Sequence, residues 1–505
     1  MSNFKTLTMT DSYAKFNSKI KKLYLYILIF VFTQNCFGQI NTLKDYKDFT
    51  IKIGKERFKA YKGLIYVKEK YSDTSSNLIY LPVIIIKSLS STPEEPIFWC
   101  EGGPGVSNLN FHPPKCLLEK HDVVLIGYRG IDGKTELNSK EIEKAIKGLH
   151  NQLLSDKSLD NIEKEIKKYI IELSEKNIDL TNYTIIDVID DLENVRKALG
   201  YNKINLLSVS YGTRVALLYG YRYPNAIHRS IMIGVNPPGH FIWYPEKTSQ
   251  IIKLYDSLYQ NSTLSNVSIE QDINNALKNI PKRWSLFKLD RDKIRTGAFL
   301  LLYSKGNAVT AFDAFHKAAT EKDYSGLYLM QLLYDVMVPK SFVWGDMFNK
   351  AASADLNNNI DYRKLFRGDT VSIGAPFSLL LFGCSKAWPS FTIDEKFRKI
   401  DTSFIETLMI SGNLDISTPS DFTTKELLPF LPNGRQIILK DMAHADDLMH
   451  RQRPSFENLI TTYFDKGVVD TSAYKYDAID FKPSKDFCHI AKVYYPIIAI
   501  ISLFK

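Results

Sequence analysis

One serine of this sequence stands at a turn that could present a nucleophile to a substrate. Ser210 ends the apolar run "INLLSVS" and precedes a helical pattern that starts at Tyr211, with Gly212 two positions after the serine. A strand-turn-helix motif of the form G-x-S-x-G presents a serine in this way, but Ser208 occupies the position of its first glycine. The turn alone is therefore consistent with a catalytic nucleophile or with an ordinary turn serine.

An aspartate and a histidine later in the chain complete the groups that serine-based hydrolysis of an ester or amide requires. Asp415 follows the apolar run "TLMISGN", and His444 follows the run "RQIILKDM". Because loops at strand ends position reactive side chains, we predict Asp415 as the orienting acid and His444 as the base. The flanking Asp441, Asp446 and Asp447 are expected to be solvated or helix-capping groups. The chain order serine, aspartate, histidine is the order of α/β-hydrolases.

A glycine-rich loop supplies candidate donors for the oxyanion. Gly102, Gly103, Pro104 and Gly105 follow the apolar run "PIFWCE", and glycines let a backbone amide approach a bound group closely. We predict that the oxyanion hole is formed by Gly102, Gly103 and the amide of Tyr211. A Gly-Pro sequence also marks plain turns, which is the alternative interpretation of this loop.

Seven short apolar runs predict the sheet that would position these residues. They start at Leu81, Pro96, Asp122, Lys203, Arg229, Thr407 and Arg435. Continuous Val/Ile/Leu runs indicate strands that are covered on both faces. Helical patterns lie between several runs, such as the one that begins at Asp187 and ends with Gly200 as a C-cap. This alternation predicts the α/β class, with a mostly parallel, doubly wound sheet.

A long insertion separates two of these runs. Roughly 170 residues, rich in aromatic and helical pattern, lie between Val235 and Thr407. We predict that they form a large helical cap over the carboxyl edge of the sheet, inserted between the sixth and seventh core strands. The apolar tail from Val493 is too short to span a bilayer and is expected to dock on the body. The predicted divisions are a core at residues 39–239, the cap at 240–400, and the rest of the core with the tail at 401–505.

The amino terminus predicts export. Lys19, Lys21 and Lys22 precede the apolar run 23–32, and the small residue Gly38 closes the segment. This arrangement is typical of a signal peptide, here residues 1–38. The apolar run is about half the ~20 residues of a membrane-spanning helix, so an uncleaved anchor is the weaker alternative. We therefore expect a periplasmic or secreted protein with no stable membrane span.

Composition and charge narrow the remaining possibilities. With 505 residues, of which 45% are hydrophobic, the chain is long enough to bury a sizeable core. Without residues 1–38 the formal charge falls from +9 to +5, because five lysines and one aspartate leave, and so modest a charge does not indicate a nucleic-acid partner. The mixed-charge stretch 139–180 is expected to form solvated helices.

Four cysteines remain after the predicted cleavage, and export would let them pair in any of three connectivities. Cys100 ends an apolar run and could equally be a buried thiol. None has C-x-x-C spacing, so no zinc site is expected, and the sequence gives no reason to expect a metal or another cofactor. The four residues are Cys100, Cys116, Cys384 and Cys488.

Longer stretches resemble the α/β-hydrolase aminopeptidases related to prolyl iminopeptidase and the secreted bacterial tripeptidyl aminopeptidases, of peptidase type S33. The resemblance implies an α/β-hydrolase fold and a serine exopeptidase that removes residues from the free amino end of short peptides through an acyl-enzyme on Ser210. It also implies cap carboxylates that hold the substrate's ammonium group. The insertion contains many acids, and no motif selects among them; examples are Glu246, Asp313, Glu321 and Asp335. The matching stretches are "GGPG" at 102–105, "DVVLIGYRGIDGKT" from Asp122, the segment 183–224, "SGNLDISTP" from Ser411 and "MAHAD" from Met442.

Two departures from that family bear on substrate choice. Glu101 stands where prolyl iminopeptidases carry histidine, and Tyr128 stands where an aspartate is often found; both argue against a strict proline preference. An esterase or another small-molecule acyl hydrolase is the first alternative, because acyl transfer uses the same triad. A non-catalytic binding protein, suggested by Ser208 and Glu101, is the second. The expected partners are short peptides or small acyl substrates, and the sequence does not indicate an oligomeric state.

Overall fold

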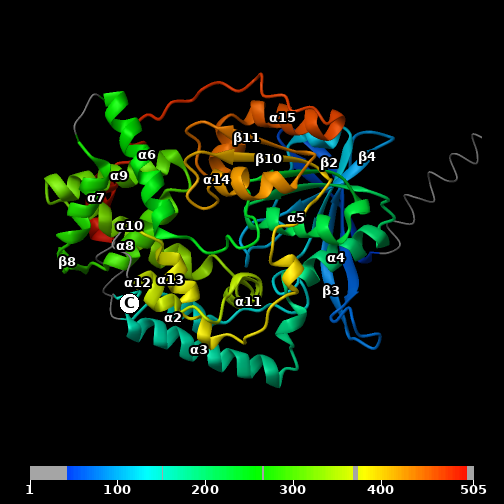
Figure 1. Cartoon of the computed structure of the whole chain (residues 1–505), viewed down its shortest axis with the longest axis horizontal. Helices are drawn as coiled ribbons and strands as arrows, with labels where there is room; N and C mark the ends of the chain where they lie inside the picture. Colours follow the sequence, from blue (N-terminus) through cyan, green and yellow to red (C-terminus); the bar gives the residue numbers. More distant parts are fainter. Residues whose placement is uncertain (1–42, 150–151, 264–266, 368–372, 498–505) are drawn as a thin grey trace, which may run out of the picture.

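The computed structural model describes residues 43–149, 152–263, 267–367 and 373–497, so the predicted signal peptide lies outside the described residues. Its centre is a nine-stranded sheet with the order β1-β2-β3-β5-β4-β6-β7-β10-β11 (Figure 1). The strands from β5 to β11 in that order run parallel, and β1, β2 and β3 pair antiparallel on one side. The strands are β1 (Lys44–Ile53), β2 (Glu56–Lys68), β3 (Leu78–Ile86), β4 (Glu94–Cys100), β5 (His121–Ile126), β6 (Ile204–Val209), β7 (Ile227–Ile233), β10 (Glu406–Gly412) and β11 (Gly434–Leu439).

All seven predicted runs are strands of this sheet, and the predicted α/β class with a mostly parallel sheet is confirmed. Two further strands, β1 and β2, were not predicted. β1 is exposed along most of its length, and β2 alternates exposed and buried residues, so neither forms a continuous apolar run. When β1 and β2 are counted, the long insertion follows the seventh strand of the sheet in chain order, β7, and precedes the eighth, β10.

Successive residues of the parallel strands point to opposite faces, as the pleat requires. In β5, Val124 and Ile126 pack on the side that holds the apolar residues of α4 and α5, whereas Val123 and Leu125 pack on the side of α15. Burial on both faces explains the continuous apolar pattern of these strands, except in the edge strand β11, which is only partly buried. The helices around the sheet are α4 (Ile185–Ala198), α5 (Tyr211–Arg222), α14 (Ser420–Phe422) and α15 (Arg453–Lys466), whereas α2 (Lys140–Ile146) and α3 (Asp156–Glu175) lie along the insertion, below α12 and α13 in Figure 1.

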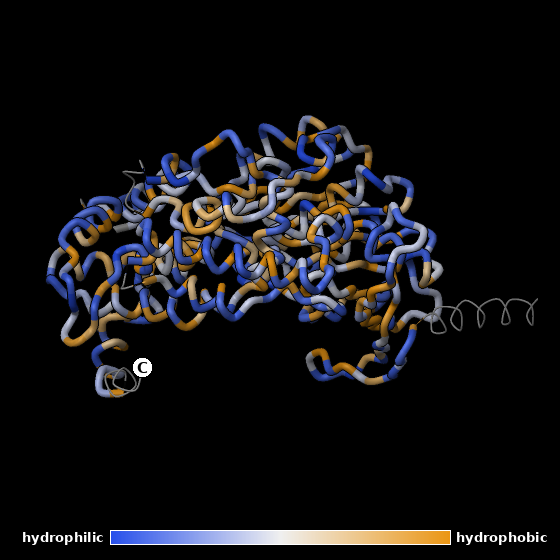
Figure 2. The backbone as a smooth tube through the Cα atoms, turned by 90° about the horizontal axis from the view of Figure 1, so that it is seen from below, coloured by the Kyte–Doolittle hydropathy of each residue, from blue (hydrophilic) through white to orange (hydrophobic). Residues whose placement is uncertain are grey.

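A helical layer formed by the insertion lies beside the sheet, at the left of the view in Figure 1. Figure 2, turned by 90° about the horizontal axis, shows that the molecule is elongated along that axis. The helices are α6 (Pro245–Thr263), α7 (Ile269–Lys278), α8 (Arg291–Leu301), α9 (Lys305–Thr320), α10 (Ser325–Met337), α11 (Trp344–Asp355), α12 (Tyr362–Arg367) and α13 (Pro376–Phe382), with a two-stranded sheet of β8 (Arg283–Trp284) and β9 (Phe287–Lys288).

The described part of the carboxyl-terminal tail docks on this helical layer. Helix α16 (Phe487–Val493) packs against α10, and Lys492 Nζ lies 2.6 Å from an oxygen of Asp323. Among the described residues, no helix is both long and apolar enough to cross a membrane. The four cysteines that could have paired are all free thiols: Cys100, Cys384 and Cys488 are buried, and Cys116 is partly exposed.

Candidate functional site

Ser210 lies at a strained turn between β6 and α5. Its backbone has φ 52° and ψ −124°, in a region that a residue with a side chain rarely adopts. The turn is held by its amide, which donates to Ile233 O at 2.8 Å, and by its carbonyl, which accepts from the N–H and the hydroxyl of Thr213. A Cβ at Gly212 would lie 2.1 Å from Cys100 O, so only glycine fits there. This is the geometry of a strand-to-helix turn that exposes a serine oxygen.

Ser208 does not prevent this turn. The residue lies in β6 and is fully buried, and its hydroxyl donates to Ile231 O of the neighbouring strand β7 at 2.9 Å. The position that is usually glycine is thus filled by a side chain whose one polar group is satisfied inside the sheet. The difference from G-x-S-x-G leaves the conformation of Ser210 intact.

His444 and Asp415 are paired at the carboxyl ends of β11 and β10. His444 Nδ1 lies 2.7 Å from Asp415 Oδ2. The carboxylate is fully buried and accepts three further hydrogen bonds, from the amides of Ser417 and Thr418 and from the Thr418 hydroxyl, at 2.7–2.8 Å. These bonds fix the acid, and the acid fixes the imidazole in one orientation. Gly234, after β7, borders the ring: a Cβ there would lie 2.8 Å from His444 Cε1.

Ser210 and His444 line one cavity of about 250 Å³ beneath the insertion. Its walls are mostly apolar and aromatic, and Glu101 is the one acidic side chain that lines it among the described residues. None of the four acids of the insertion that were named as examples above lines this cavity. The main apolar lining residues are Val106, Phe241, Trp243, Leu300, Tyr303, Phe342, Met347 and Phe377.

The glycine loop lies against Ser210, but its amides differ in availability. The Gly102 N–H donates to Glu101 Oε1 at 2.8 Å, so it is not free to serve as an oxyanion donor, which corrects that part of the prediction. What Gly102 provides is space, because a Cβ there would lie 3.1 Å from Ser210 Cβ. The amides of Gly103 and Tyr211 have no hydrogen-bond partner within the described parts of the chain.

Helix α11 of the insertion holds the glycine loop. Val343 N–H donates to Gly105 O at 2.8 Å, and Gly105 N–H donates to Asp346 Oδ2 at 3.2 Å. Asp346 and Lys350 form an ion pair in which both side chains are fully buried. Burial raises the pKa of Asp346 to about 6, and the ammonium of Lys350 opposes that rise. Sequence reasoning missed this contact, since nothing local connects a loop at 102–105 with a helix 240 residues later.

A second part of the insertion holds the loop of His444. The His444 amide donates to Tyr303 O at 3.1 Å. Asp447 accepts from the amides of Ala443 and Lys305 and from the Ser304 hydroxyl, at 2.9–3.0 Å. Asp447 is therefore a buried cap for the start of α9, one of the two roles expected for it, and is not solvated.

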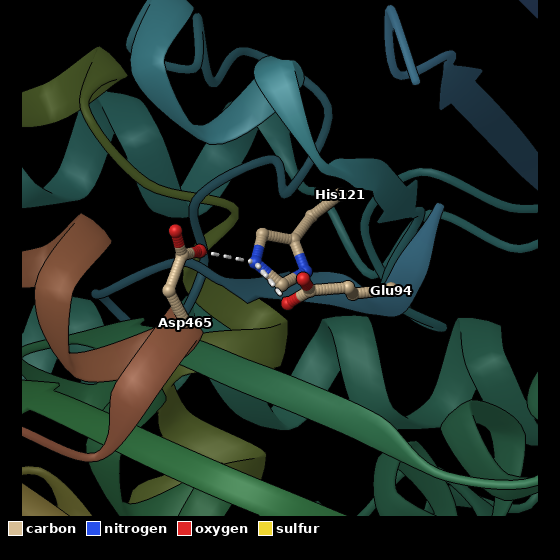
Figure 3. A group of neighbouring side chains, drawn as sticks. All are labelled: Glu94, His121 and Asp465. Atoms are coloured by element: carbon tan, nitrogen blue, oxygen red, sulfur yellow. Dashed lines mark hydrogen bonds and ion pairs between the residues drawn. The ribbon is translucent and has the colours of Figure 1, made fainter. Parts of the chain in front are cut away.

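One other group among the described residues has the composition of a metal site. Glu94, His121 and Asp465 lie at the starts of β4 and β5 and in α15 (Figure 3). His121 Nδ1 donates to Glu95 O, and Nε2 lies 3.2 Å from Asp465 Oδ1. Lys120 Nζ lies 2.7 Å from Asp465 Oδ2 and 3.4 Å from Glu94 Oε1. Because a lysine already supplies the positive charge, we interpret this group as an ion-pair cluster that ties α15 to the sheet.

Comparison with known proteins agrees with this topology. The family model described as alpha/beta hydrolase fold matches residues 95–266. Tripeptidyl aminopeptidase of Streptomyces lividans is 26% identical over 204 residues, 37% of this chain and 38% of that protein. Serine protease Hip1 of Mycobacterium tuberculosis is 28% identical over 149 residues, 27% of this chain and 28% of that protein. The chain thus spans less than two fifths of the length of these curated relatives.

Solved structures with a similar fold are more distant still. A serine hydrolase of Cycloclasticus zankles, CCSP0084, is 12% identical with a TM-score of 0.37, covering 84% of this chain and 100% of its own. The 2-hydroxy-6-oxo-6-phenylhexa-2,4-dienoate hydrolase of Rhodococcus sp. strain RHA1 is also 12% identical with a TM-score of 0.37, covering 80% of this chain and 99% of its own. Similarity at this level is too low to support a functional comparison.

Proposed function

Because the chain has the α/β-hydrolase fold, we propose that it is a serine hydrolase in which Ser210 is the nucleophile, His444 the base and Asp415 the orienting acid. The observation that carries this proposal is the bond of 2.7 Å between His444 Nδ1 and Asp415 Oδ2 at the wall of the cavity that Ser210 also lines. We further propose the amides of Gly103 and Tyr211 as the oxyanion donors, since both are unpaired within the described residues.

The reaction follows from these roles. Ser210 Oγ attacks the carbonyl carbon while His444 Nε2 takes the hydroxyl proton, and the two amides stabilise the oxyanion of the tetrahedral intermediate. Collapse breaks the bond to the leaving group, which receives that proton from His444, and leaves an acyl group on Ser210. A water molecule, deprotonated by His444, then releases the acid and restores the serine.

Within this class we propose an aminopeptidase that acts on short peptides and is exported to the periplasm or beyond. Support comes from relatives named tripeptidyl aminopeptidase and serine protease, and from the signal-like segment at residues 1–38. We assign residues 39–239 and 401–505 to the catalytic core and 240–400 to the cap. The apolar walls of the cavity favour one alternative, an esterase for small acyl substrates.

Labelling with a serine-directed fluorophosphonate tests the nucleophile. We expect wild-type protein to be labelled and Ser210→Ala to be unlabelled, with turnover reduced by about 10⁴-fold or more. Ser208→Ala is the matched control, because Ser208 is buried two residues earlier and bonded within the sheet; it should be labelled as wild type is. Labelling that persists in Ser210→Ala would contradict the proposal.

Substrate panels separate the two activities. Peptides with a free amino terminus, the same peptides with an N-acetyl group, and p-nitrophenyl butyrate are offered to the wild-type protein. If the protein is an aminopeptidase, it should cleave the peptides with a free amino terminus efficiently and should not cleave their N-acetyl forms. Hydrolysis of the ester with no cleavage of either peptide set would favour the esterase.

A further inference from the structure

The cavity contains one carboxyl group for which no cation is provided. Glu101 lies at the end of β4, partly buried against the glycine loop, and it lines the cavity together with Ser210 and His444. Its Oε1 accepts the Gly102 amide at 2.8 Å, and its Oε2 accepts Trp99 Nε1 at 3.3 Å. Among the described residues, no lysine, arginine or histidine forms an ion pair with it. Removing a carboxylate from water without a cation is costly, so the pocket is suited to a ligand that brings the positive charge.

The surroundings hold this carboxyl group in place. The Glu101 amide donates to Asn108 Oδ1 at 2.7 Å, and the fully buried Asn108 in turn donates to the carbonyls of Trp99 and Ile126. The Trp99 ring stacks on Phe111 with centroids 3.8 Å apart. Each carboxylate oxygen retains a free lone pair after these bonds. Several buried polar groups therefore fix one acidic side chain at the wall of the cavity.

The other titratable groups next to Glu101 do not neutralise it. Burial raises the pKa of Cys100 to about 12 and raises that of Tyr128 well above its usual value, so both stay uncharged. Burial also raises the pKa of Glu101, against the lowering effect of its two hydrogen bonds. An ammonium group beside the carboxylate would offset that burial cost.

The distance from Glu101 to the nucleophile limits where such an ammonium could be. A Cβ at Gly102 would lie 3.7 Å from Ser210 Oγ, and the Gly102 nitrogen lies 2.8 Å from Glu101 Oε1. Two covalent bonds, about 3 Å in all, join that nitrogen to the Cβ position, so the carboxylate lies within roughly 9.5 Å of Ser210 Oγ. This bound lets Glu101 reach the ammonium of the attacked residue, and the small volume of the cavity is what limits the bound segment to one residue.

We propose that Glu101 binds the α-ammonium of the residue whose carbonyl Ser210 attacks, so that the substrate is a peptide or amide with a free, apolar amino-terminal residue that leaves alone. This inference rests on the proposed serine hydrolase and assigns its substrate recognition to the core rather than to acids of the insertion. The cavity of about 250 Å³ is small for a ligand pocket, which agrees with one bound residue. Its aromatic walls, including Phe241 and Trp243, fit an apolar side chain.

The test compares Glu101→Gln with wild type on three substrates: phenylalanine p-nitroanilide, its N-acetyl derivative and p-nitrophenyl butyrate. Glutamine keeps an acceptor for the Gly102 amide but removes the charge. We expect kcat/KM for the free amine to fall about 100-fold, equivalent to about 2.7 kcal/mol, and ester hydrolysis to change less than threefold. Glu101→Asp keeps the charge and should retain the preference for the free amine. Glu246→Gln, an exposed acid of α6, is the matched control and should match wild type on all three.

The outcomes separate this inference from the proposed function. An equal loss on the amine and the ester in Glu101→Gln would mean that Glu101 only supports the glycine loop, which overturns the inference and leaves the hydrolase intact. A loss of amine preference in Glu246→Gln would also overturn it. Wild-type protein that hydrolyses none of the substrates and resists the fluorophosphonate would overturn the hydrolase and this inference together.

Discussion

Replacing Gly234 by alanine should disturb the proposed base without removing any polar side chain of the site. Gly234 follows β7 with φ +60°, and its amide donates to Ile410 O at 2.9 Å. A methyl group there would meet His444 Cε1 at 2.8 Å and Nδ1 at 3.1 Å. Because the ring is bonded to the buried Asp415, it cannot yield without loosening that bond.

The size of the effect follows from the contact. Ordinary van der Waals contact begins at 3.4 Å, so the ring must move from 2.8 to 3.4 Å, about 0.6 Å. A misplacement of 1 Å can cost about 10²-fold in rate, and we therefore expect kcat/KM for p-nitrophenyl butyrate to fall between about 10- and 100-fold. Because alanine is strained at this positive φ, the free energy of unfolding should also fall by about 1–2 kcal/mol.

A second glycine separates the two effects. Gly200, after α4, has φ +73° and nothing within 4 Å of its Cβ position. Gly200→Ala should carry the same backbone cost in urea unfolding and leave the rate of hydrolysis unchanged. If Gly234→Ala hydrolyses the ester at more than a third of the wild-type rate, His444 is not the base or its position is not critical, and the proposed triad is refuted.

Three further predictions address the surroundings of the site. Ser208→Gly should keep full activity and lose about 1 kcal/mol of stability in urea unfolding, the net value of one hydrogen bond; a loss of activity would show that the serine shapes the turn. Asp346→Asn should lower the free energy of unfolding in urea by about 3–5 kcal/mol, because Lys350 is left buried without its anion. Asp313→Asn breaks a less buried ion pair on α9 and should lower it by about 1 kcal/mol or less. Since burial raises the pKa of Glu101, the ratio of amine to ester kcat/KM should rise with pH through that pKa in wild type, and stay flat over the same range in Glu101→Gln; parallel profiles would contradict the assigned role.

The sheet could be predicted from sequence where its strands are buried on both faces. Apolar runs such as "KINLLSVS" are favourable only when they are shielded from water, and each of the seven predicted runs is a strand of the sheet. β1 and β2 were missed because β1 is largely solvated and rich in lysine, so its residues carry no signal of a covered strand. The local pattern thus identifies strands that are apolar in sequence, including the partly exposed edge strand β11, and it misses a strand whose residues are mostly polar and solvated.

The positions of Ser210, Asp415 and His444 could be proposed because each directly follows a strand, and the ends of parallel strands converge. Whether the Gly102 amide is free could not be predicted from the sequence, since it depends on the rotamer of Glu101. Nor could the contacts of Asp346 and Asp447, which join residues more than 140 positions apart through the packing of the insertion. Such contacts leave no local pattern in the sequence.

These long-range contacts make the insertion part of the site rather than a cover for it. Helix α11 binds Gly105 through Val343 and Asp346, and the turn before α9 binds the loop of His444 through its backbone and Asp447. One loop follows the central strand β4 and the other follows the edge strand β11, and the insertion contacts both. A movement of α11 or of the turn before α9 away from the sheet would therefore also release the oxyanion loop or the histidine loop. Access to the cavity and alignment of the proposed catalytic groups are in this way coupled through the same hydrogen bonds.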